Sequence, residues 1–284
     1  MTLSISILVD WLNPCVTAAV ELIRDRGVTV GLIRPEDQSW TLDPRPLAHD
    51  LYVLKSGTEM ALSLAGTLDA AGARTLNPFP TVAFMRSKVN VMAALLQGGV
   101  PVPETWVTSE LGGLVAALAM GPLILKPYRG SRGEGIRIVR ERAELEAITP
   151  DGPLVVQRFH PHGRDRKLYC IGSRVFGVKR IWPLRTYDDK LGEPFDPTPT
   201  QRDIVSRCGE IFGIDLFGLD LVESEGQPYV VDVNKFGSFM GVPDAPRLLA
   251  DYLIEAARST DPTRSAQAIE VASNALAPLA RALA

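Results

Sequence analysis

The sequence has few cysteines and no long hydrophobic segment. Its 284 residues include three cysteines, Cys15, Cys170 and Cys208. They are odd in number and show no CxxC spacing, so we expect reduced thiols rather than a disulfide framework. The longest uncharged run, residues 111–125, is interrupted by a Gly-Pro pair and is shorter than the ~20 residues that cross a bilayer. These absences predict an intracellular protein that does not act in a membrane.

The chain also lacks an excess of charge of either sign. Its 30 basic and 33 acidic residues give a net charge of −3, so no nucleic-acid partner is predicted and any basic site must be local. The first residues lack the basic region of a signal peptide and reach Asp10 after a short apolar stretch. We therefore expect a cytoplasmic protein. Its length is that of about two domains.

Two nucleotide-binding signatures are missing. No GxGxxG follows the first expected strand, residues 4–9, which argues against a dinucleotide-binding Rossmann domain. The glycine-rich segment 129–135 does not have the GxxxxGK[ST] spacing of a Walker A loop. A nucleotide site, if present, must be built in another way.

The pattern of strands and helices predicts an α/β fold followed by an α+β fold. The first 80 residues alternate between strands (4–9, 28–33 and 51–55) and helices (14–26 and 59–71), which predicts a parallel sheet covered on both faces. From residue 86 onward we expect helices at 86–97, 110–120, 141–148, 201–212 and 245–259. The strands expected between them are 105–108, 123–127, 136–139, 154–159, 167–171 and 175–180. Residues 260–284 form an alanine-rich tail that these patterns do not place.

A predicted hairpin brings two carboxylates together. Residues 216–222 and 228–234 are rich in β-forming side chains, and a three-residue turn at 225–227 would join them. That turn places Asp220 opposite Asp232, with Asn234 on the same face two residues further along. Two like charges side by side are unfavourable without compensation, and oxygen ligands of this kind suit Mg²⁺. The alternative is an exposed polar strand face.

Two further features point to an anionic ligand. The expected strand 123–127 brings Lys126 to the glycine-rich turn, where backbone N–H groups could approach a phosphate, although such a turn can also be a plain hairpin. The segment 158–190 holds nine basic and three acidic residues, a local charge of +6. This segment is either a solvated edge or a field for an anion.

Taken in order, four segments resemble the ATP-grasp superfamily. They are LILKPYRGSRGEGIRIV, VVQRFH, DRKLYCIGSRVFGVKR and DLFGLDLVESEGQPYVVDVNKFGSF. The resemblance implies an N-terminal α/β domain (1–82) before a two-lobed ATP-grasp fold. That fold would have a small lid subdomain with a linking helix (83–158), a C-terminal subdomain (159–259) and then the tail (260–284).

The resemblance also implies roles for individual residues. ATP would be bound by Lys88, Lys126, the loop residues Ser131, Arg132, Gly133 and Gly135, the hinge residues Gln157, Arg158, Phe159 and His160, and Asp165 and Lys167. One or two Mg²⁺ ions would be held by Asp220, Asp232 and Asn234. Lys179 or Arg180 would face the γ-phosphate, and His162 and Arg185 would contact the substrate.

Within the superfamily the chain is similar to two branches, the RimK-like carboxylate-amine ligases and the inositol polyphosphate kinases. Asp232-Val233-Asn234 and the His162-Gly163 pair resemble the kinases, whereas Arg158 and Lys235 depart from the usual patterns. The favoured hypothesis is an Mg-ATP-dependent ligase that activates a small carboxylate and joins it to an amine. The alternatives are a kinase of a polyol or inositol phosphate and a non-catalytic nucleotide-binding protein. The expected partner is a small, anionic substrate, and a homo-oligomer is possible by the same resemblance.

Overall fold

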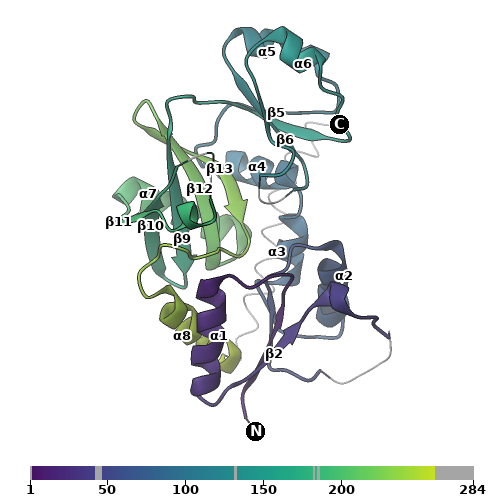
Figure 1. The fold of residues 1–284 in the computed structure, drawn as a ribbon, viewed down its shortest axis with the longest axis vertical. Helices are drawn as coiled ribbons and strands as arrows, with labels where there is room; N and C mark the ends of the chain where they lie inside the picture. Colours follow the sequence, from purple (N-terminus) through teal and green to yellow (C-terminus); the bar gives the residue numbers. More distant parts are fainter. Residues whose placement is uncertain (1, 42–46, 131–132, 182, 184–185, 260–284) are drawn as a thin grey trace.

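Three sheets make up the part of the chain that the structure describes. The computed structural model describes residues 2–41, 47–130, 133–181, 183 and 186–259. The sheets follow one another along the long axis of the molecule, with the N-terminal sheet at the bottom of Figure 1 and the sheet of β5 to β8 at the top. Among the described residues, no helix is both long and apolar enough to cross a membrane.

The N-terminal sheet is parallel, as predicted. Its strands are β1 (Ser4–Leu8), β2 (Thr29–Ile33), β3 (Leu51–Leu54) and β4 (Thr75–Leu76), in the order β2-β1-β3-β4. Helix α1 (Pro14–Asp25) begins where the side chain of Asn13 accepts a hydrogen bond from the Val16 amide, and Pro14 occupies the first helical turn. Helix α2 (Glu59–Ala70) packs on the other face, so the sheet is covered on both sides.

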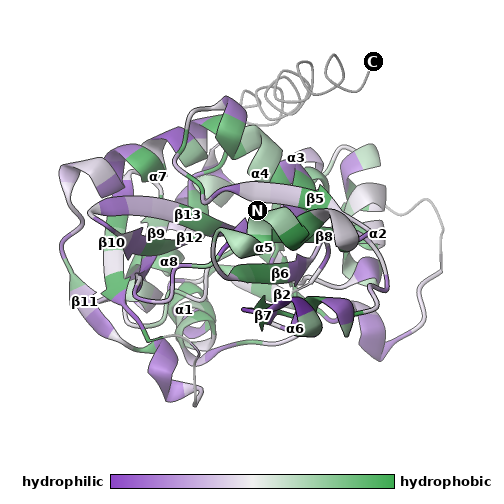
Figure 2. Ribbon diagram, turned by 90° about the horizontal axis from the view of Figure 1, so that it is seen from above, coloured by the Kyte–Doolittle hydropathy of each residue, from purple (hydrophilic) through white to green (hydrophobic). Residues whose placement is uncertain are grey.

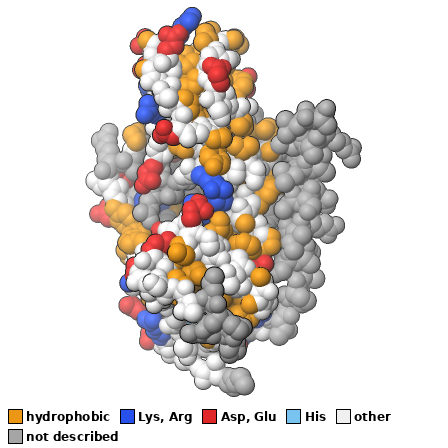
Figure 3. All heavy atoms as spheres, turned by 90° about the vertical axis from the view of Figure 1, so that its right-hand side faces the viewer, with side chains coloured by type: hydrophobic (Ala, Val, Ile, Leu, Met, Phe, Trp, Pro, Cys, Tyr) orange, Lys and Arg blue, Asp and Glu red, His pale blue; other side chains and the backbone are white. Residues whose placement is uncertain are grey.

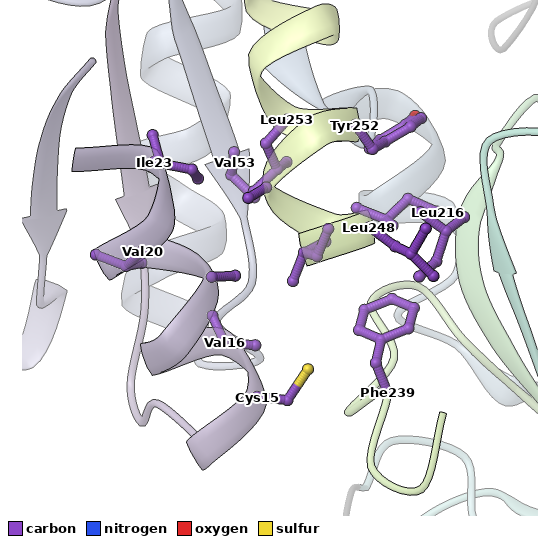
Figure 4. Packing of buried hydrophobic residues seen from close by; sticks show 14 of the residues in the cluster. Cys15, Val16, Val20, Ile23, Val53, Leu216, Phe239, Leu248, Tyr252 and Leu253 are labelled. Atoms are coloured by element: carbon purple, nitrogen blue, oxygen red, sulfur yellow. The ribbon is translucent and has the colours of Figure 1, made fainter. Parts of the chain in front are cut away.

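The C-terminal helix packs against this N-terminal unit. Helix α8 (Ala245–Arg258) lies beside α1, and Leu248 and Leu253 meet Val16 and Val20 in one apolar cluster (Figure 4). The same cluster includes Phe239 and residues of the middle sheet. The N-terminal sheet and the middle sheet therefore share one hydrophobic core.

The middle sheet is antiparallel, in the order β11-β10-β9-β12-β13. Its strands are β9 (Arg164–Ile171), β10 (Arg174–Lys179), β11 (Glu193–Phe195), β12 (Leu216–Ser224) and β13 (Gln227–Asn234). Helix α7 (Pro199–Phe212) covers one face, where Leu219 and Leu221 pack with Ile204 and Cys208. Helix α7 begins at a capping box formed by Thr198 and Gln201, two residues before the start of the helix expected from the sequence. The opposite face carries Asp220.

The third sheet forms an upper lobe with its own apolar core. It contains β5 (Thr105–Thr108), β6 (Leu123–Pro127), β7 (Arg137–Val139) and β8 (Leu154–Arg158), in the order β5-β8-β6-β7. Leu123, Leu125 and Val156 pack with Leu114 and Leu118 of the helical segment above them. Figure 2, which looks down on this lobe, shows β6 and α5 as hydrophobic segments.

Some predicted element bounds were wrong. The helix expected at 110–120 consists of a 3₁₀ turn (Gly112–Leu114) and a short α5 (Val115–Ala119), because the diglycine at its start delays regular helix formation. Helix α3 (Phe79–Phe84), which the sequence patterns missed, begins at two prolines. The remaining elements are α4 (Lys88–Gln97), α6 (Arg142–Glu146) and the 3₁₀ turns Pro35–Asp37 and Asp188–Lys190.

Candidate active site

The site is organised by the β12–β13 hairpin. Asp220 lies directly opposite Asp232, as predicted, and Gly218 opposes Asn234. The route to this pairing differs from the prediction. The turn has two residues, Glu225 and Gly226, both with positive φ, and Ser224 pairs with Gln227. A one-residue bulge at Val231 then shifts the register, so Asp232 faces Asp220 instead of pointing to the α7 side.

Each carboxylate is neutralised by a lysine. The Lys88 Nζ, at the start of α4, lies 2.8 Å from both carboxylate oxygens of Asp232. The Lys167 Nζ, on β9 and opposite Asp220 in the register, lies 2.8 Å from the Asp220 Oδ2. The Asn234 Nδ2 donates to the same oxygen at 2.8 Å. Asn234 therefore contacts Asp220 directly, and each of the two carboxylates is paired with its own lysine.

Burial and charge act in opposite directions on Asp220. Burial by itself raises the pKa of this carboxyl, but the Lys167 ammonium and the Asn234 amide outweigh burial and lower it. The carboxylate is therefore held ionised at neutral pH. Gly218, next but one on β12, leaves room for this pairing, because a Cβ there would lie 3.2 Å from the Lys167 Cε.

The donor chemistry of this group fits Mg²⁺. Asp220 and Asp232 supply carboxylate oxygens and Asn234 an amide oxygen, which are the hard ligands that Mg²⁺ prefers. Two carboxylates are also the number at which Mg²⁺ typically completes its shell with waters and substrate phosphates. Among the described residues no cluster of three or more His, Cys, Asp or Glu side chains could hold a metal without such help.

Lys126 reaches the hairpin from the upper lobe. Its side chain is buried, and its Nζ donates to the Gln157 Oε1 at 2.7 Å and to the Val231 carbonyl at 2.9 Å. The second acceptor is the backbone of the bulge residue, whose carbonyl the ladder leaves available. Burial, partly offset by Asp232, lowers the pKa of Lys126 to about 8. The bulge therefore has two effects on the site: it turns Asp232 toward Asp220, and its carbonyl binds Lys126.

The glycine-rich segment after Lys126 is the turn of the β6–β7 hairpin. Gly133 and Gly135 have positive φ, and a Cβ at Gly135 would lie 2.8 Å from the Pro127 Cγ. Ser131 and Arg132, predicted in the same loop, and Arg185 lie outside the described residues, as does the tail 260–284.

The structure separates Lys179 from Arg180. The Lys179 Nζ pairs with Glu193 at 2.8 Å across the β10–β11 edge. The Arg180 Nη2 instead donates to the Tyr169 hydroxyl at 2.7 Å, and Tyr169 lies on the same face as Lys167, two residues along β9. Arg180 therefore belongs to the carboxylate face. Within the described part of the chain, its buried Nε has no hydrogen-bond partner.

Tyr169 connects Arg180 to the N-terminal unit. Its ring is fully buried, and its hydroxyl also hydrogen-bonds to the Ser238 Oγ at 2.8 Å. The Ser238 carbonyl in turn accepts from the Asn13 side chain at 3.1 Å. The sequence patterns did not find these residues, since they are polar groups at scattered positions with no motif of their own.

The segment predicted as a hinge leaves β8 at the junction of the lobes. Gln157 is fully buried and holds Lys126. The Arg158 guanidinium binds the Ala117 and Gly121 carbonyls and pairs with Glu104 at 3.0 Å, which anchors it in the upper lobe. The Phe159 amide donates to the Pro122 carbonyl at 2.9 Å. The predicted adenine-binding role of this segment stays a prediction.

The remaining predicted residues lie after this hinge. His160 stacks on Tyr229 with ring centroids 5.0 Å apart, and burial lowers its pKa. His162 lies in an exposed turn before β9. Asp165, on the same face of β9 as Lys167, is half-buried, and burial together with Asp220 raises its pKa to about 6. Their predicted roles toward ATP and substrate stay predictions.

A second charged group, which the sequence patterns missed, lies beside the first. Arg86 precedes α4, and its Nη2 lies 2.7 Å from the Glu59 Oε1 at the start of α2. Lys235 follows Asn234 directly, and burial together with the Arg86 guanidinium lowers its pKa to about 8. The only sequence signal for this group was the unusual lysine after Asn234.

Comparison with known proteins places this geometry among characterised folds. The family model described as a RimK-like ATP-grasp domain matches residues 85–243. A probable alpha-L-glutamate ligase of Trichodesmium erythraeum is 23% identical over 206 residues, covering 67% of this chain and 69% of the relative. A probable alpha-L-glutamate ligase 1 of Shewanella denitrificans is 24% identical over 266 residues, covering 83% and 90%.

Solved structures agree on the fold. A RimK domain ATP-grasp protein from Sphaerobacter thermophilus superposes with a TM-score of 0.71 at 23% identity, covering 88% of this chain and 99% of that one. The D-cycloserine synthetase DcsG superposes with a TM-score of 0.70 at 18% identity, covering 90% and 100%. The predicted arrangement, an N-terminal α/β unit followed by a two-lobed ATP-grasp fold, is confirmed at this level.

Proposed function

This chain belongs to the RimK-like ATP-grasp family, and we propose that it uses Mg-ATP to activate a carboxylate as an acyl phosphate and join it to an amine. The observation that carries the proposal is the meeting of Asp220, Asp232 and Asn234 with cations from three separate parts of the fold. Lys126 comes from the upper lobe, Lys88 from α4, and Lys167 from the middle sheet. Oxygen ligands for a metal ion next to lysines that can contact phosphate oxygens suit a metal-bound triphosphate.

We assign separate groups of residues to the metal ion, the phosphates, the base and the ribose. Asp220, Asp232 and Asn234 would hold Mg²⁺, which when bound neutralises charge on the transferring phosphoryl group. Lys88 and Lys126 would contact phosphate oxygens, which requires Lys88 to exchange its ion pair with Asp232 for one with the nucleotide. The segment 157–160 would contact the base, the β6–β7 turn would cover the phosphates, and Asp165 and Lys167 would lie toward the ribose side.

Arg180 is the residue we propose for the chemical step. Its side chain is held on the carboxylate face by Tyr169, while the Nε–H remains available for an oxygen atom of the reacting groups. There it would stabilise the negative charge that develops on the γ-phosphoryl oxygens and on the acyl phosphate. Because Lys179 pairs with Glu193, it is not proposed for this role.

The proposed reaction has two steps, phosphoryl transfer and then attack by the amine. A carboxylate oxygen of the substrate attacks the γ-phosphorus and ADP departs, which leaves an acyl phosphate. The amine then attacks the acyl carbon, inorganic phosphate leaves with the former carboxylate oxygen, and the nitrogen loses a proton. Neither step needs a covalent enzyme nucleophile, in agreement with the burial of all three cysteines.

The names of the relatives favour a ligase over the kinase alternative. The two relatives quoted above are called glutamate ligases, and one solved neighbour is an ATP-grasp ligase, PsnB, complexed with a precursor peptide. We infer that the acceptor is a small molecule or a peptide with a free amine. The presence of both carboxylates and all the cations named above argues against a non-catalytic nucleotide-binding protein.

An isotope experiment separates ligase from kinase. The enzyme is incubated with ATP, Mg²⁺, an amine panel and ¹⁸O-labelled carboxylic acids, and released phosphate is analysed by mass spectrometry. A ligase transfers one ¹⁸O atom from the carboxylate to each phosphate and forms one amide. Retention of the phosphoryl group on a hydroxyl would establish the kinase instead, and nucleotide binding without turnover would favour the non-catalytic alternative.

A further inference from the structure

An exposed pair of aromatic side chains lies where the N-terminal unit meets the middle sheet. The rings of Trp11 and Tyr187, which we call the aromatic pair, are perpendicular, with centroids 5.6 Å apart. Trp11 is 45% exposed and Tyr187 is 37% exposed. Single exposed apolar side chains are ordinary, and the face drawn in Figure 3 shows many of them among polar atoms. Two exposed rings in contact are less ordinary, and they are typical of a binding surface.

Trp11 lies at the edge of the parallel sheet where ligands bind in such folds. Strand β1 pairs with β2 on one side and with β3 on the other, so the strand order reverses direction at β1. In open α/β sheets, ligands bind in the crevice outside the carboxyl ends of the strands at this switch point. Trp11 comes shortly after β1, and Lys55 directly follows β3. The Lys55 Nζ donates to the Trp11 carbonyl at 2.7 Å, which fixes the backbone of Trp11 across the switch point.

Tyr187 lies near the backbone that holds Arg180. Leu191, four residues after Tyr187, packs on Gly241, where a Cβ would collide with the Leu191 carbonyl oxygen. The adjacent Met240 carbonyl accepts from the Arg180 Nη2 at 3.4 Å. Burial raises the pKa of Tyr187 and the Arg180 guanidinium opposes this, so the two side chains are within electrostatic range of each other.

Trp11 has its own connection to Arg180. Asn13, two residues after Trp11, donates to the Ser238 carbonyl at 3.1 Å. The Ser238 Oγ hydrogen-bonds to the Tyr169 hydroxyl, which in turn accepts from Arg180. Both members of the aromatic pair are therefore connected, through short chains of contacts, to the residue proposed for the chemical step.

We propose that the aromatic pair binds the side chain of the amine acceptor, and that this side chain is an aromatic ring. The assignment deepens the proposed function and rests on it. A third ring would make the edge-to-face or offset contacts that aromatic groups favour, and it would cover apolar surface that water now contacts. The Lys190 Nζ lies 4.7 Å from the Tyr187 centroid and the Lys55 Nζ lies 5.9 Å from the Trp11 centroid. A basic acceptor side chain would have to compete with these ammonium groups for the rings, whereas an uncharged ring would not.

Two simple amides test the assignment. L-phenylalaninamide and L-alaninamide each have an amine and no free carboxylate, so neither can take the place of the activated substrate. Their binding is measured by titration calorimetry, with the full chain saturated in Mg²⁺ and a non-hydrolysable ATP analogue. Wild-type protein should bind L-phenylalaninamide more tightly by about tenfold or more, the effect of burying one ring. Trp11→Ala and Tyr187→Ala should each remove most of this preference and leave L-alaninamide affinity within a factor of two.

Tryptophan fluorescence distinguishes direct contact from a structural role. L-phenylalaninamide should change the emission of the wild-type protein. Trp11→Phe should keep most of the affinity, because it retains an aromatic ring, but should lose most of the emission change. Met120→Ala is the matched control, since it removes an 81% exposed apolar side chain after α5 in the upper lobe. It should change neither amide affinity.

Three results would overturn the assignment. One is a wild type that binds L-phenylalaninamide no better than L-alaninamide. Another is a preference that persists in both Trp11→Ala and Tyr187→Ala. The third is a Trp11→Ala variant that loses affinity for the ATP analogue in place of the amide, which would make the aromatic pair a nucleotide contact. Failure of the ligase proposal is read separately, since the ¹⁸O transfer can be absent while the calorimetric preference persists.

Discussion

Asp220 and Asp232 face each other across β12–β13 only because Val231 is an extra residue in the ladder. With the two-residue turn at Glu225-Gly226 and an unbroken ladder, Val231 would oppose Asp220, and Asp232 would point toward α7. One bulge therefore determines whether the second carboxylate lies on the sheet face that carries Asp220. It also supplies the carbonyl that binds Lys126.

Replacing either carboxylate should remove activity without unfolding the protein. We expect Asp232→Asn and Asp220→Asn each to lower kcat by at least about 100-fold, because each removes a charged oxygen ligand from the transition state. The Asp232 side chain is 29% exposed, so its replacement should change the thermal midpoint little, whereas Asp220→Asn leaves the buried Lys167 ammonium without its carboxylate and should lower the midpoint. Steady-state assays over a range of Mg²⁺ concentrations measure the first effect, and calorimetric unfolding the second. Near wild-type kcat in either variant would contradict the metal assignment.

Lys126→Met should make the ligand-free protein more stable at neutral pH and weaken its binding of ATP. The folded-state pKa of Lys126, about 8, lies below its ordinary value of 10.5, so below pH 8 the folded protein holds this ammonium at a cost. Removing it should stabilise the ligand-free protein by about 1–2 kcal/mol at pH 7, after the loss of two hydrogen bonds. The gain should shrink above pH 8, reach zero before pH 10.5 and become a net loss above it, because the two hydrogen bonds are then lost without relief of a charge penalty. Denaturant unfolding at several pH values measures it.

The same variant should bind the nucleotide less well. Loss of a charge-assisted contact predicts a weakening of ATP affinity by about tenfold or more. Lys179→Met provides a comparison, since that lysine pairs with Glu193 at the sheet edge and should leave ATP affinity unchanged. Equal ATP affinity in wild type and Lys126→Met would contradict the proposed phosphate contact.

Asp165→Asn should make stability less dependent on pH. The raised folded-state pKa, about 6 against 3.8, means that the folded protein tolerates ionised Asp165 less well than the unfolded chain does. The stabilising effect of protonation is complete below about pH 4 and is lost as pH rises through 6. The asparagine variant should therefore be more stable than wild type by about 1–3 kcal/mol at pH 7, with no difference below pH 4. A difference that is constant over pH would refute this.

Tyr169→Phe tests the proposed role of Arg180 without replacing Arg180 itself. The substitution removes the hydroxyl that binds the Arg180 Nη2 and the Ser238 Oγ but keeps the buried ring. We expect kcat to fall by about tenfold with little change in the KM for ATP, since a less well-fixed guanidinium stabilises the transition state less effectively. A change confined to the thermal midpoint would show that Tyr169 is structural only.

The cysteines should be unreactive in the native state. Burial raises the pKa of Cys15 to about 11 and those of Cys170 and Cys208 to about 12, so the reactive thiolate is scarce at neutral pH. An aromatic disulfide reagent should label the native protein slowly and all three thiols rapidly after unfolding. Rapid labelling of one native cysteine would reveal local opening at that position.

The sequence predicted the hairpin carboxylates and the lysine before the glycine-rich turn because these residues lie in continuous, periodic segments. The alternation of strands and helices likewise predicted the parallel N-terminal sheet. The bulge escaped prediction, since a two-residue turn with a bulge and a three-residue turn give the same pairing of Asp220 with Asp232. The charged group of Glu59, Arg86, Arg129 and Lys235 escaped it for a different reason. Its members come from positions 59, 86, 129 and 235, and only the packing of three units brings them together.

The packing of α8 on α1 has a mechanical consequence. Because one apolar core runs from the N-terminal sheet through α8 to Tyr169, Ile171 and Leu216, these two units behave as a single rigid block. The upper lobe carries most of its apolar side chains in a separate core and is joined to the block through the segments around Pro101 and His160. Under the proposed function, we therefore expect the upper lobe to move relative to this block when a nucleotide enters. Only one half of the binding surface would then change position, and Asp220 and Asp232 would stay fixed in the block.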